Sequence, residues 1–338
     1  MKFLSDNTAP AAPEVMAALL AANEGPARSY GADDWSARLD AAFGRYFGCE
    51  VRAFPVATGT AANALSLATL SPPYGAMFAA DVAHVLNDEC GAVELQTAGA
   101  RLIPLPSQDG RLEASTLAHD LAGRVDSVHS LRPSAVTLTL VTECGTVYTP
   151  AQLAALTEVA HAHALPVHLD GARFANGLAW LGVPPADVTW RAGVDVLSFG
   201  ATKNGALAAE AVVFFNLDLV RDFERRRKRA AQLFSKMRYL SAQLLACIEG
   251  PFFQANAARA NALAARIGKA APARLAYPLE SNLAFLRLAP DEAASLRARG
   301  FEFHPWGRPD AHTYRFVVSW DQPESEVDAL CSALRAWT

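Results

Sequence analysis

A short apolar run that ends in a carboxylate occurs at Val167-His168-Leu169-Asp170-Gly171-Ala172-Arg173. The run predicts a buried strand, and the small residues after Asp170 allow another group to approach the backbone closely. In α/β proteins, ligands bind in the crevice outside the carboxyl ends of parallel strands, where Asp170 would lie. An aspartate at this point could also cap the helix that follows, so the stretch alone leaves a ligand contact and an N-cap open.

A lysine stands in a comparable place after the next predicted strand. The run Val194–Phe199 is followed by the small-residue loop Gly200-Ala201-Thr202-Lys203-Asn204-Gly205, and Lys203 is the one of only five lysines that follows a predicted strand. Burial at such a site lowers the pKa of a lysine and favours the neutral amine, which can form a Schiff base with an aldehyde. Because 33 residues, about one βαβ unit, separate Lys203 from Asp170, both side chains should lie at one edge of the sheet.

A third strand runs into a small-residue turn at Val56-Ala57-Thr58-Gly59-Thr60-Ala61-Ala62-Asn63. Free backbone N–H groups at a helix start, together with the hydroxyls of Thr58 and Thr60, suit a phosphate group. The turn has neither the lysine of a Walker A motif nor a GxGxxG pattern, and capping alone could explain it. A phosphate cradle, a reactive lysine and a strand-end acid together match pyridoxal 5′-phosphate, whose phosphate, aldehyde and pyridine nitrogen need these three partners.

The surrounding chain alternates short apolar runs with helical segments, which is typical of an α/β fold, a mainly parallel sheet flanked by helices. We predict one helix from Thr60 to Leu70 and another over Pro150–His163, with Thr149 as its N-cap. The predicted strands are Val51–Ala57, Ala83–Leu86, Arg101–Pro104, Ala135–Thr142, Pro166–Leu169, Val194–Phe199 and Ala211–Phe215.

A change of pattern after Leu217 predicts a second, smaller domain. A long helical stretch to about Ile248 and a helix to about Ile267 come before an α+β unit. The strands of this unit are predicted at Ser281–Leu288, Phe301–Pro305 and Thr313–Trp320, and its helices at Pro290–Arg299 and Pro323–Trp337. We expect a large α/β domain with an N-terminal arm over residues 1–249 and a small C-terminal α+β domain over residues 250–338.

The composition excludes several classes of protein. Of 338 residues, 51% are hydrophobic and 19% charged, with a formal net charge of −4, which argues against disorder and against binding to nucleic acid. The basic run Arg225–Arg229 is expected to form a solvated or interface-facing helix surface. No apolar stretch reaches the roughly 18 residues of a membrane span. Five scattered cysteines without a CxxC pair favour the reducing cytoplasm. His161 and His163 should point to different helix faces, so we expect no metal site.

The order of the motifs resembles that of the low-specificity L-threonine aldolases, pyridoxal-phosphate (PLP) enzymes of fold type I, the aspartate aminotransferase-like group. The resemblance spans nearly the whole chain and implies cleavage of L-threonine, L-allo-threonine or a related β-hydroxy-α-amino acid, such as phenylserine, to glycine and an aldehyde. It also implies a homo-oligomer, a dimer or tetramer, with active sites at subunit interfaces. The motifs that carry it are Ser5-Asp6-Asn7-Thr8, Tyr30-Gly31-Ala32-Asp33, Thr58-Gly59-Thr60, His84, His168–Arg173 and Thr202–Gly205.

The resemblance further implies a role for each matching residue. Lys203 would form the Schiff base with the cofactor, Asp170 would pair with the pyridine nitrogen, and His84 would stack on the ring. The phosphate would be held by Gly59 and Thr60, with Thr58 and Thr202. The substrate carboxylate would be received by Ser5, by Arg315 and by Arg173 close to the cofactor, with Tyr30 reaching the site across a subunit boundary. Arginine suits this role because its guanidinium can donate two parallel hydrogen bonds. Arg315 could instead point outward from a half-exposed strand.

One segment departs from the family pattern. Many threonine aldolases carry a His-Asn pair after the central strand, near the substrate hydroxyl, whereas Leu140–Tyr148 contains no histidine. We therefore expect His84, acting through a water, to be the base for the β-hydroxyl, with Glu89 or Glu143 as alternatives. If His84 only stacks, a water polarised by the cofactor phosphate would have to serve.

Two other functions are compatible with these residues. Another PLP-dependent lyase or an aminotransferase acting on amino acids would use the same cofactor contacts. A regulator could bind the cofactor without turnover. Lys203 and Asp170, and the lack of a DNA-binding segment in the sequence, favour the enzyme.

Overall fold

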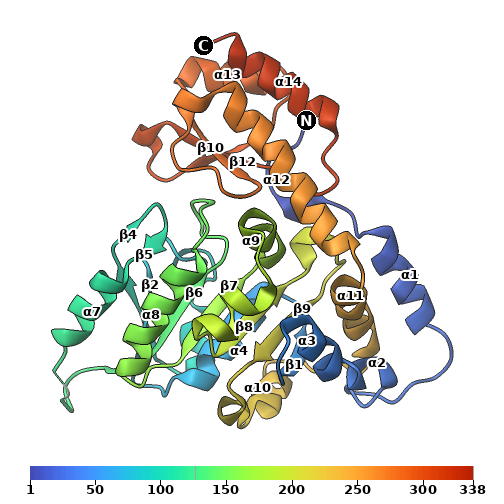
Figure 1. Ribbon diagram of the computed structural model, residues 1–338, viewed down its shortest axis with the longest axis vertical. Helices are drawn as coiled ribbons and strands as arrows, with labels where there is room; N and C mark the ends of the chain where they lie inside the picture. The colour runs from blue at the N-terminus through green and yellow to red at the C-terminus, as the bar shows by residue number, and fades with distance from the viewer. Residues whose placement is uncertain (126, 338) are drawn as a thin grey trace.

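A seven-stranded sheet forms the centre of the large α/β part of the molecule (Figure 1), and the computed structural model describes residues 1–125 and 127–337. The strand order is β1-β9-β8-β7-β6-β2-β3, and β9 alone runs antiparallel to its neighbours. The expectation of a mainly parallel sheet flanked by helices is therefore confirmed. The strands are β1 (Arg52–Val56), β2 (Gly75–Ala80), β3 (Arg101–Leu105), β6 (Arg132–Thr139), β7 (Val167–Gly171), β8 (Val196–Gly200) and β9 (Glu210–Phe214), with the small hairpin β4 (Ser107–Gln108) and β5 (Arg111–Leu112) beside them.

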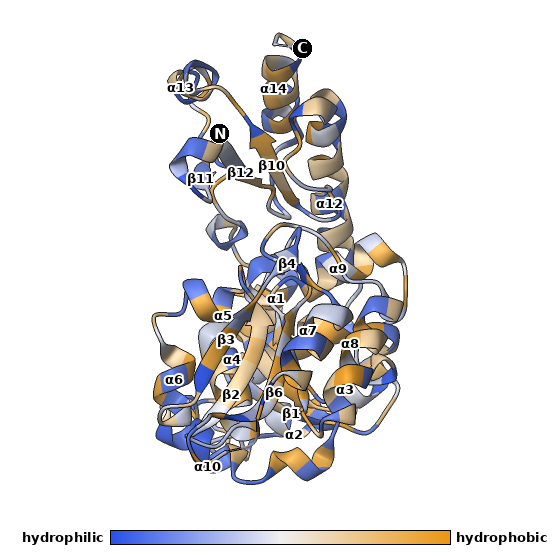
Figure 2. Cartoon of the chain, turned by 90° about the vertical axis from the view of Figure 1, so that its left-hand side faces the viewer, coloured by the Kyte–Doolittle hydropathy of each residue, from blue (hydrophilic) through white to orange (hydrophobic). Residues whose placement is uncertain are grey.

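Alternate side chains of these strands enter two separate cores, one on each face of the sheet. In β8, Val196 packs into the core beneath α4 (Gly59–Leu70), whereas Leu197 and Phe199 belong to the larger core on the opposite face. A strand covered on both faces is apolar along its whole length, and Figure 2 shows the central strands coloured mainly as hydrophobic. The other helices of this part are α1 (Pro13–Ala22), α2 (Asp34–Ala37), α3 (Leu39–Phe47), α5 (His84–Asn87), α6 (Ala92–Thr97), α7 (Ala114–Ala122), α8 (Pro150–Ala162), α9 (Phe174–Leu181), α10 (Phe223–Arg229) and α11 (Arg238–Glu249).

The C-terminal part forms a three-stranded antiparallel sheet with its own core, at the top of Figure 1. Its strands are β10 (Leu283–Arg287), β11 (His304–Trp306) and β12 (Thr313–Val317), and its helices are α12 (Phe252–Ala270), α13 (Pro290–Ala298) and α14 (Glu324–Arg335). The N-terminus joins this unit, because Phe3 is fully buried in its core and its backbone bonds to Glu302 and Val317. The N-terminal arm thus connects the small sheet to the large domain.

Two expectations about local structure are wrong. The segment predicted as the strand Ala83–Leu86 forms the helical turn α5, and the strand beside it, β2, lies at Gly75–Ala80, where small residues gave no strand signal. The helical stretch expected from Leu217 to Ile248 is broken between α10 and α11, where Ala231 has a φ of 59°. A positive φ at a residue with a Cβ ends a helix.

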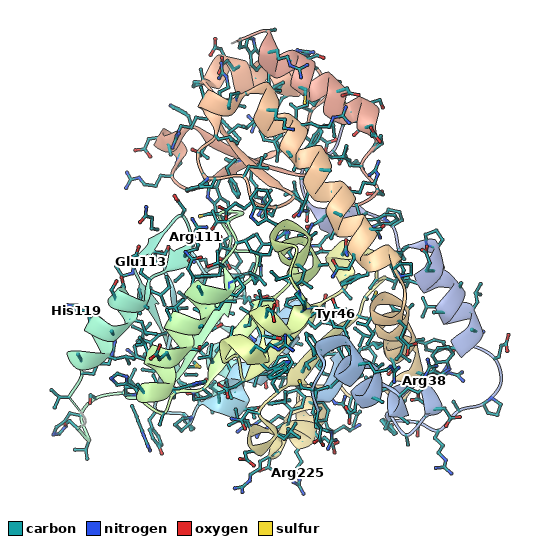
Figure 3. All side chains as sticks on the ribbon, in the orientation of Figure 1. Arg38, Tyr46, Arg111, Glu113, His119 and Arg225 are labelled. Atoms are coloured by element: carbon teal, nitrogen blue, oxygen red, sulfur yellow. The ribbon has the colours of Figure 1, made fainter. Side chains whose placement is uncertain are left out.

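The other predicted elements occur within a few residues of their expected bounds. Thr149 caps α8 as expected, within a capping box in which Gln152 bonds back to the Thr149 backbone at 2.9 Å. The basic run forms α10, which lies at the far end of the molecule from the small domain, as the label on Arg225 in Figure 3 shows. None of the helices in the described residues is long and apolar enough to cross a membrane.

Candidate active site

Most of the predicted site residues lie at one edge of the large sheet, where the carboxyl ends of the parallel strands meet. Asp170 lies in β7 opposite Ser198 of the parallel strand β8, and Lys203 follows β8 in the short 3-10 helix Thr202–Asn204. The start of α4 reaches the same edge after β1, and α5 reaches it after β2. The expected juxtaposition of Asp170 and Lys203 is confirmed, since both line one pocket. That pocket is lined by Gly59, Thr60, Asn63, His84, Glu89, Thr139, Val141, Glu143, Asp170, Ala172, Arg173 and Lys203.

Asp170 is not an N-cap, because α9 begins only at Phe174. Its side chain is 4% exposed and accepts hydrogen bonds from the Ala172 amide at 2.9 Å and from Nδ2 of Asn63 at 2.7 Å. The N-cap interpretation is therefore wrong, and the ligand contact of Asp170 stays a prediction.

A buried hydrogen-bonded chain leads from Asp170 to His84. Nδ2 of Asn63 also donates to Oε1 of Glu89 at 2.8 Å, and the same oxygen lies 2.8 Å from Nδ1 of His84. The hydrogen bond to Glu89 raises the pKa of His84, although burial opposes the change. Oδ1 of Asn63 and Oε2 of Glu89 are buried without a partner among the described residues.

Glu143 approaches the pocket from the turn after β6. Its Oε1 accepts the backbone N–H of His84 at 2.8 Å and the Thr139 hydroxyl at 3.2 Å, whereas its Oε2 is buried and has no partner in the described chain. Burial raises the pKa of this carboxyl to about 7, and the nearby Asp170 carboxylate contributes in the same direction.

Lys203 is held close to the pocket by contacts of its loop rather than by a salt bridge, since within the described residues its amine has none. The loop is fixed by Oε2 of Glu210, which accepts the Ala201 amide at 2.9 Å, and by Asn204, whose Nδ2 donates to the Phe253 carbonyl at 2.6 Å. Burial lowers the pKa of Lys203, and the Arg173 charge lowers it further. This direction agrees with the sequence-based expectation.

Arg173 is held by an aspartate from the N-terminal arm. Its Nε and Nη2 donate to Oδ2 and Oδ1 of Asp6 at 2.6 and 3.0 Å, and Nδ2 of Asn282 bonds to the same carboxylate at 3.2 Å. Arg315 lies close by, with Nη2 3.5 Å from the Leu4 carbonyl and Nε buried without a partner among the described residues. Burial and the charge of Arg173 both lower the pKa of Arg315. Its side chain therefore points inward, not outward from an exposed strand.

Five of the predicted site residues do not line this pocket: Arg315, described above, and Thr58, Thr202, Ser5 and Tyr30. The hydroxyl of Thr58 caps α4 by accepting the Ala61 amide at 3.1 Å. Thr202 accepts the Ala209 amide at 3.3 Å, and Ser5 accepts the Asn7 amide at 3.2 Å. Tyr30 is 52% exposed, with Nζ of Lys228 4.4 Å above its ring.

The sequence-based prediction missed Asp6, Asn63, Thr139 and Asn282 as members of this cluster. Asn63 left a signal, because it is a polar residue among the apolar residues of a buried helix. Asp6 stood in a motif that was noted, but its partner Arg173 is 167 residues away. No local pattern could have paired the two.

These groups fit the cofactor that the sequence suggests. Asp170 offers a buried carboxylate to a protonated ring nitrogen, Lys203 offers an amine with a lowered pKa, and the start of α4 offers backbone donors. A Cβ added at Gly59 would meet no atom within 4 Å, so space is open in front of this helix start.

Comparisons with known proteins agree on one group. The family model described as β-eliminating lyase matches residues 2–304. Two proteins named low specificity L-threonine aldolase, from a Pseudomonas species and from Pseudomonas aeruginosa, are 39% and 40% identical to this chain, and each match covers 99% of this chain and 97% of the relative.

Solved structures give the same picture of the fold. A threonine aldolase from Leishmania major superimposes with a TM-score of 0.93 at 25% identity and covers 99% of both chains. An aspartate aminotransferase from Rhodobacter sphaeroides has a TM-score of 0.74 at 15% identity, with 100% of this chain and 92% of that chain covered. At that identity the second match is informative about the fold alone.

Proposed function

The chain belongs to the β-eliminating lyase family and, within it, to the low specificity L-threonine aldolases, and we propose that it cleaves L-threonine and related β-hydroxy-α-amino acids to glycine and an aldehyde. One observation carries the proposal most strongly. Asp170, in β7, and Lys203, just after the adjacent parallel strand β8, line the same pocket. The chain that carries them is about 40% identical over its length to a curated threonine aldolase. The enzyme is therefore a PLP-dependent carbon–carbon lyase.

The pocket residues would hold the cofactor as follows. Lys203 would be the amine that binds the cofactor aldehyde covalently, and Asp170 would keep the ring nitrogen protonated by accepting its hydrogen bond. The start of α4 at Gly59 and Thr60 would hold the phosphate, and the Thr58 hydroxyl could still donate its proton to it while its oxygen accepts the cap bond. His84, which lines the same pocket, would stack on the ring. When bound, pyridoxal phosphate supplies an electron-withdrawing ring that stabilises negative charge at the α-carbon of the substrate.

The two arginines would bind the substrate carboxylate. Asp6 occupies Nε and Nη2 of Arg173, and Nε of Arg315 has no partner among the described residues. The Nη1 donors of Arg173 and this Nε are therefore left for a carboxylate between them. Burial and, after it, repulsion by the Arg173 guanidinium lower the pKa of Arg315, and an anion between the two groups would relieve that repulsion. Ser5 would complete this subsite from the N-terminal arm.

The proposal includes a homo-oligomer, a dimer or tetramer, in the cytoplasm. Tyr30 lies outside the pocket of its own chain and is exposed, so it is available to a neighbouring copy's site. The five cysteines are all free, as a reducing compartment requires. Size-exclusion chromatography with light scattering, repeated with Tyr30→Ala, tests the assembly.

The products formed from L-threonine, L-allo-threonine and L-phenylserine test the reaction. An aldolase gives glycine and an aldehyde, whereas another lyase or an aminotransferase gives ammonia or a keto acid. Lys203→Ala should remove both the cleavage and the absorbance of covalently bound cofactor. Turnover by that variant at the normal rate would contradict the proposal.

A further inference from the structure

We propose that Glu143 is the general base that removes the proton from the β-hydroxyl of the substrate. This inference rests on the proposed function, because only an aldol-type cleavage needs a base at that oxygen. Sequence-based reasoning favoured His84 for this role, and the structure gives physical reasons to prefer Glu143.

A general base needs one group that holds it in place and one atom that can accept the proton, and the two carboxylate oxygens of Glu143 meet these two needs. Oε1 is held by the backbone N–H of His84 and by the Thr139 hydroxyl, at 2.8 and 3.2 Å. Oε2 has no partner in the described residues, although it is buried in a residue that lines the pocket. A buried acceptor without a donor is unfavourable by about 1–3 kcal/mol. A substrate hydroxyl would supply that donor.

One of the two ring nitrogens of His84 is already engaged. Its Nδ1 lies 2.8 Å from Oε1 of Glu89, and this hydrogen bond raises the pKa of the imidazole. A raised pKa means that His84 loses its proton at a higher pH than an ordinary histidine, and only above that pH can Nε2 accept a proton.

Glu89 lies in direct contact with the His84 imidazole. Its Oε1 contacts both Asn63 and His84, whereas its Oε2, like that of Glu143, has no partner among the described residues. The side chain of Glu89 is completely shielded from solvent and forms an ion pair with His84 when the imidazole is protonated. Among the described residues, Glu143 accepts hydrogen bonds from an uncharged amide and a hydroxyl, both at Oε1, and it forms no salt bridge. Of the two carboxylates, Glu143 is thus the one able to take up a proton from a ligand.

The electrostatics of the pocket favour proton exchange near neutral pH. Burial raises the pKa of Glu143 to about 7, which the Asp170 carboxylate reinforces and the His84 amide opposes. The other charged groups that line the pocket are Glu89, Arg173 and Lys203. A base whose pKa lies near the working pH combines a useful ionised fraction with a sufficient affinity for the proton.

The turn that carries Glu143 is held by the small domain. Oγ of Ser281 donates to the Gly145 carbonyl at 2.9 Å, and Oε2 of Glu280 accepts the Val147 amide at 2.7 Å. Glu280 also bonds to Arg111 of the large domain at 2.9 Å, and Figure 3 shows Arg111 on the side that faces the small domain. Such support from neighbouring elements gives a catalytic group the fixed geometry that it needs.

The proposed step is balanced within the substrate and Glu143. The carboxylate takes the hydroxyl proton, and the O–H electron pair forms the carbonyl double bond of the departing aldehyde. The Cα–Cβ bond breaks, and its electron pair stays with Cα. Cα then takes up one proton, which gives glycine.

Glu143→Gln tests the assignment, because glutamine can still accept the His84 amide but cannot take a proton at neutral pH. Three measurements on this variant distinguish cofactor binding, proton transfer at Cα and proton removal at the β-hydroxyl. They are cofactor absorbance, exchange of the glycine α-proton in D₂O by NMR, and cleavage of L-threonine. Exchange at Cα needs no base at a β-hydroxyl. The matched control is Glu158→Gln, on the exposed face of α8.

We expect Glu143→Gln to bind cofactor and exchange glycine within about threefold of the wild type, but to cleave L-threonine about 100-fold or more slowly. The rise of kcat/KM with pH near pH 7 should disappear in this variant, and Glu143→Asp should recover part of the rate. Cleavage within about fivefold of the wild type, or an equal loss of exchange and cleavage, would overturn the assignment. A wild-type enzyme that forms no glycine from L-threonine would instead contradict the proposed function.

Discussion

Asp6 and Arg173 form a bidentate ion pair that joins the N-terminal arm to the active-site edge of the large sheet, with N–O distances of 2.6 and 3.0 Å. Asp6 is only 1% exposed, and Asn282 of the small domain bonds to the same carboxylate. The pair therefore connects three parts of the chain. It also fixes the plane of the guanidinium before any substrate carboxylate arrives.

Asp6→Asn should weaken substrate binding more than the chemical step. Loss of the charge-assisted pair leaves the Arg173 guanidinium free to rotate, so we expect KM for L-threonine to rise about tenfold, which corresponds to about 1.4 kcal/mol, with kcat within about threefold. Steady-state kinetics measure the separation of the two constants. Asp187→Asn, which breaks an exposed pair with Arg191, is the matched control. A fall in KM would mean that Asp6 competes with the substrate instead of orienting its partner.

The same pair predicts a contribution to stability that depends on pH. Burial alone would raise the pKa of Asp6, but the charges of Arg173 and Lys203 and the hydrogen bonds outweigh it, and the net shift is downward. A lowered pKa in the folded state stabilises the protein above the unfolded-state value of about 3.9, and this stabilisation is lost as the pH falls through the folded-state pKa. Urea unfolding at neutral and acid pH should show a smaller acid-induced loss of stability in Asp6→Asn than in the wild type. Parallel losses in both proteins would refute the prediction.

Asn63→Ala should weaken cofactor binding. One amide nitrogen lies between Asp170 and Glu89, at 2.7 and 2.8 Å, and its removal leaves two buried carboxylates without this donor. We expect the dissociation constant of pyridoxal phosphate to rise about tenfold or more, as fluorescence titration of the apoenzyme would measure. Ser66→Ala is the control, since that buried hydroxyl on the same helix donates to the Ala62 carbonyl and, within the described residues, bonds to none of the pocket side chains. An unchanged dissociation constant would show that Asp170 holds its orientation without Asn63.

His84→Gln tests whether the imidazole of His84 causes the pH dependence of kcat/KM. Glutamine can still donate to Glu89, but it does not titrate near neutral pH. We expect a rate reduced by about tenfold, because the ring contact is lost, with the rise of kcat/KM near pH 7 still present because it belongs to Glu143. Disappearance of that rise would return the role of base to His84.

The strand-end residues could be predicted from the sequence because their signals are local. Asp170 and Lys203 each follow an apolar run, and one βαβ unit separates them, so the parallel geometry brings them together. The contact between Asp6 and Arg173, and the bridge from Asn63 to Glu89, depend instead on how distant elements pack. The strand β2 was missed for a related reason, because Gly75–Ala80 is buried on both faces and its small residues have no period.

Gly145→Ala should destabilise the turn that carries Glu143. Gly145 has a φ of 80°, and an added Cβ would lie 3.1 Å from both Cβ and the carbonyl oxygen of Leu283. Gly182, at the end of α9, has a φ of 65°, but a Cβ added there would meet no atom within 4 Å, so Gly182→Ala isolates the backbone strain of about 1–2 kcal/mol. We expect Gly145→Ala to lower the free energy of unfolding by about 1–3 kcal/mol more than Gly182→Ala does, because its neighbours must also move. Urea unfolding of both variants measures the difference. Equal losses of unfolding free energy in the two variants would mean that Leu283 moves aside easily and that the small domain does not hold the turn with Glu143 in place.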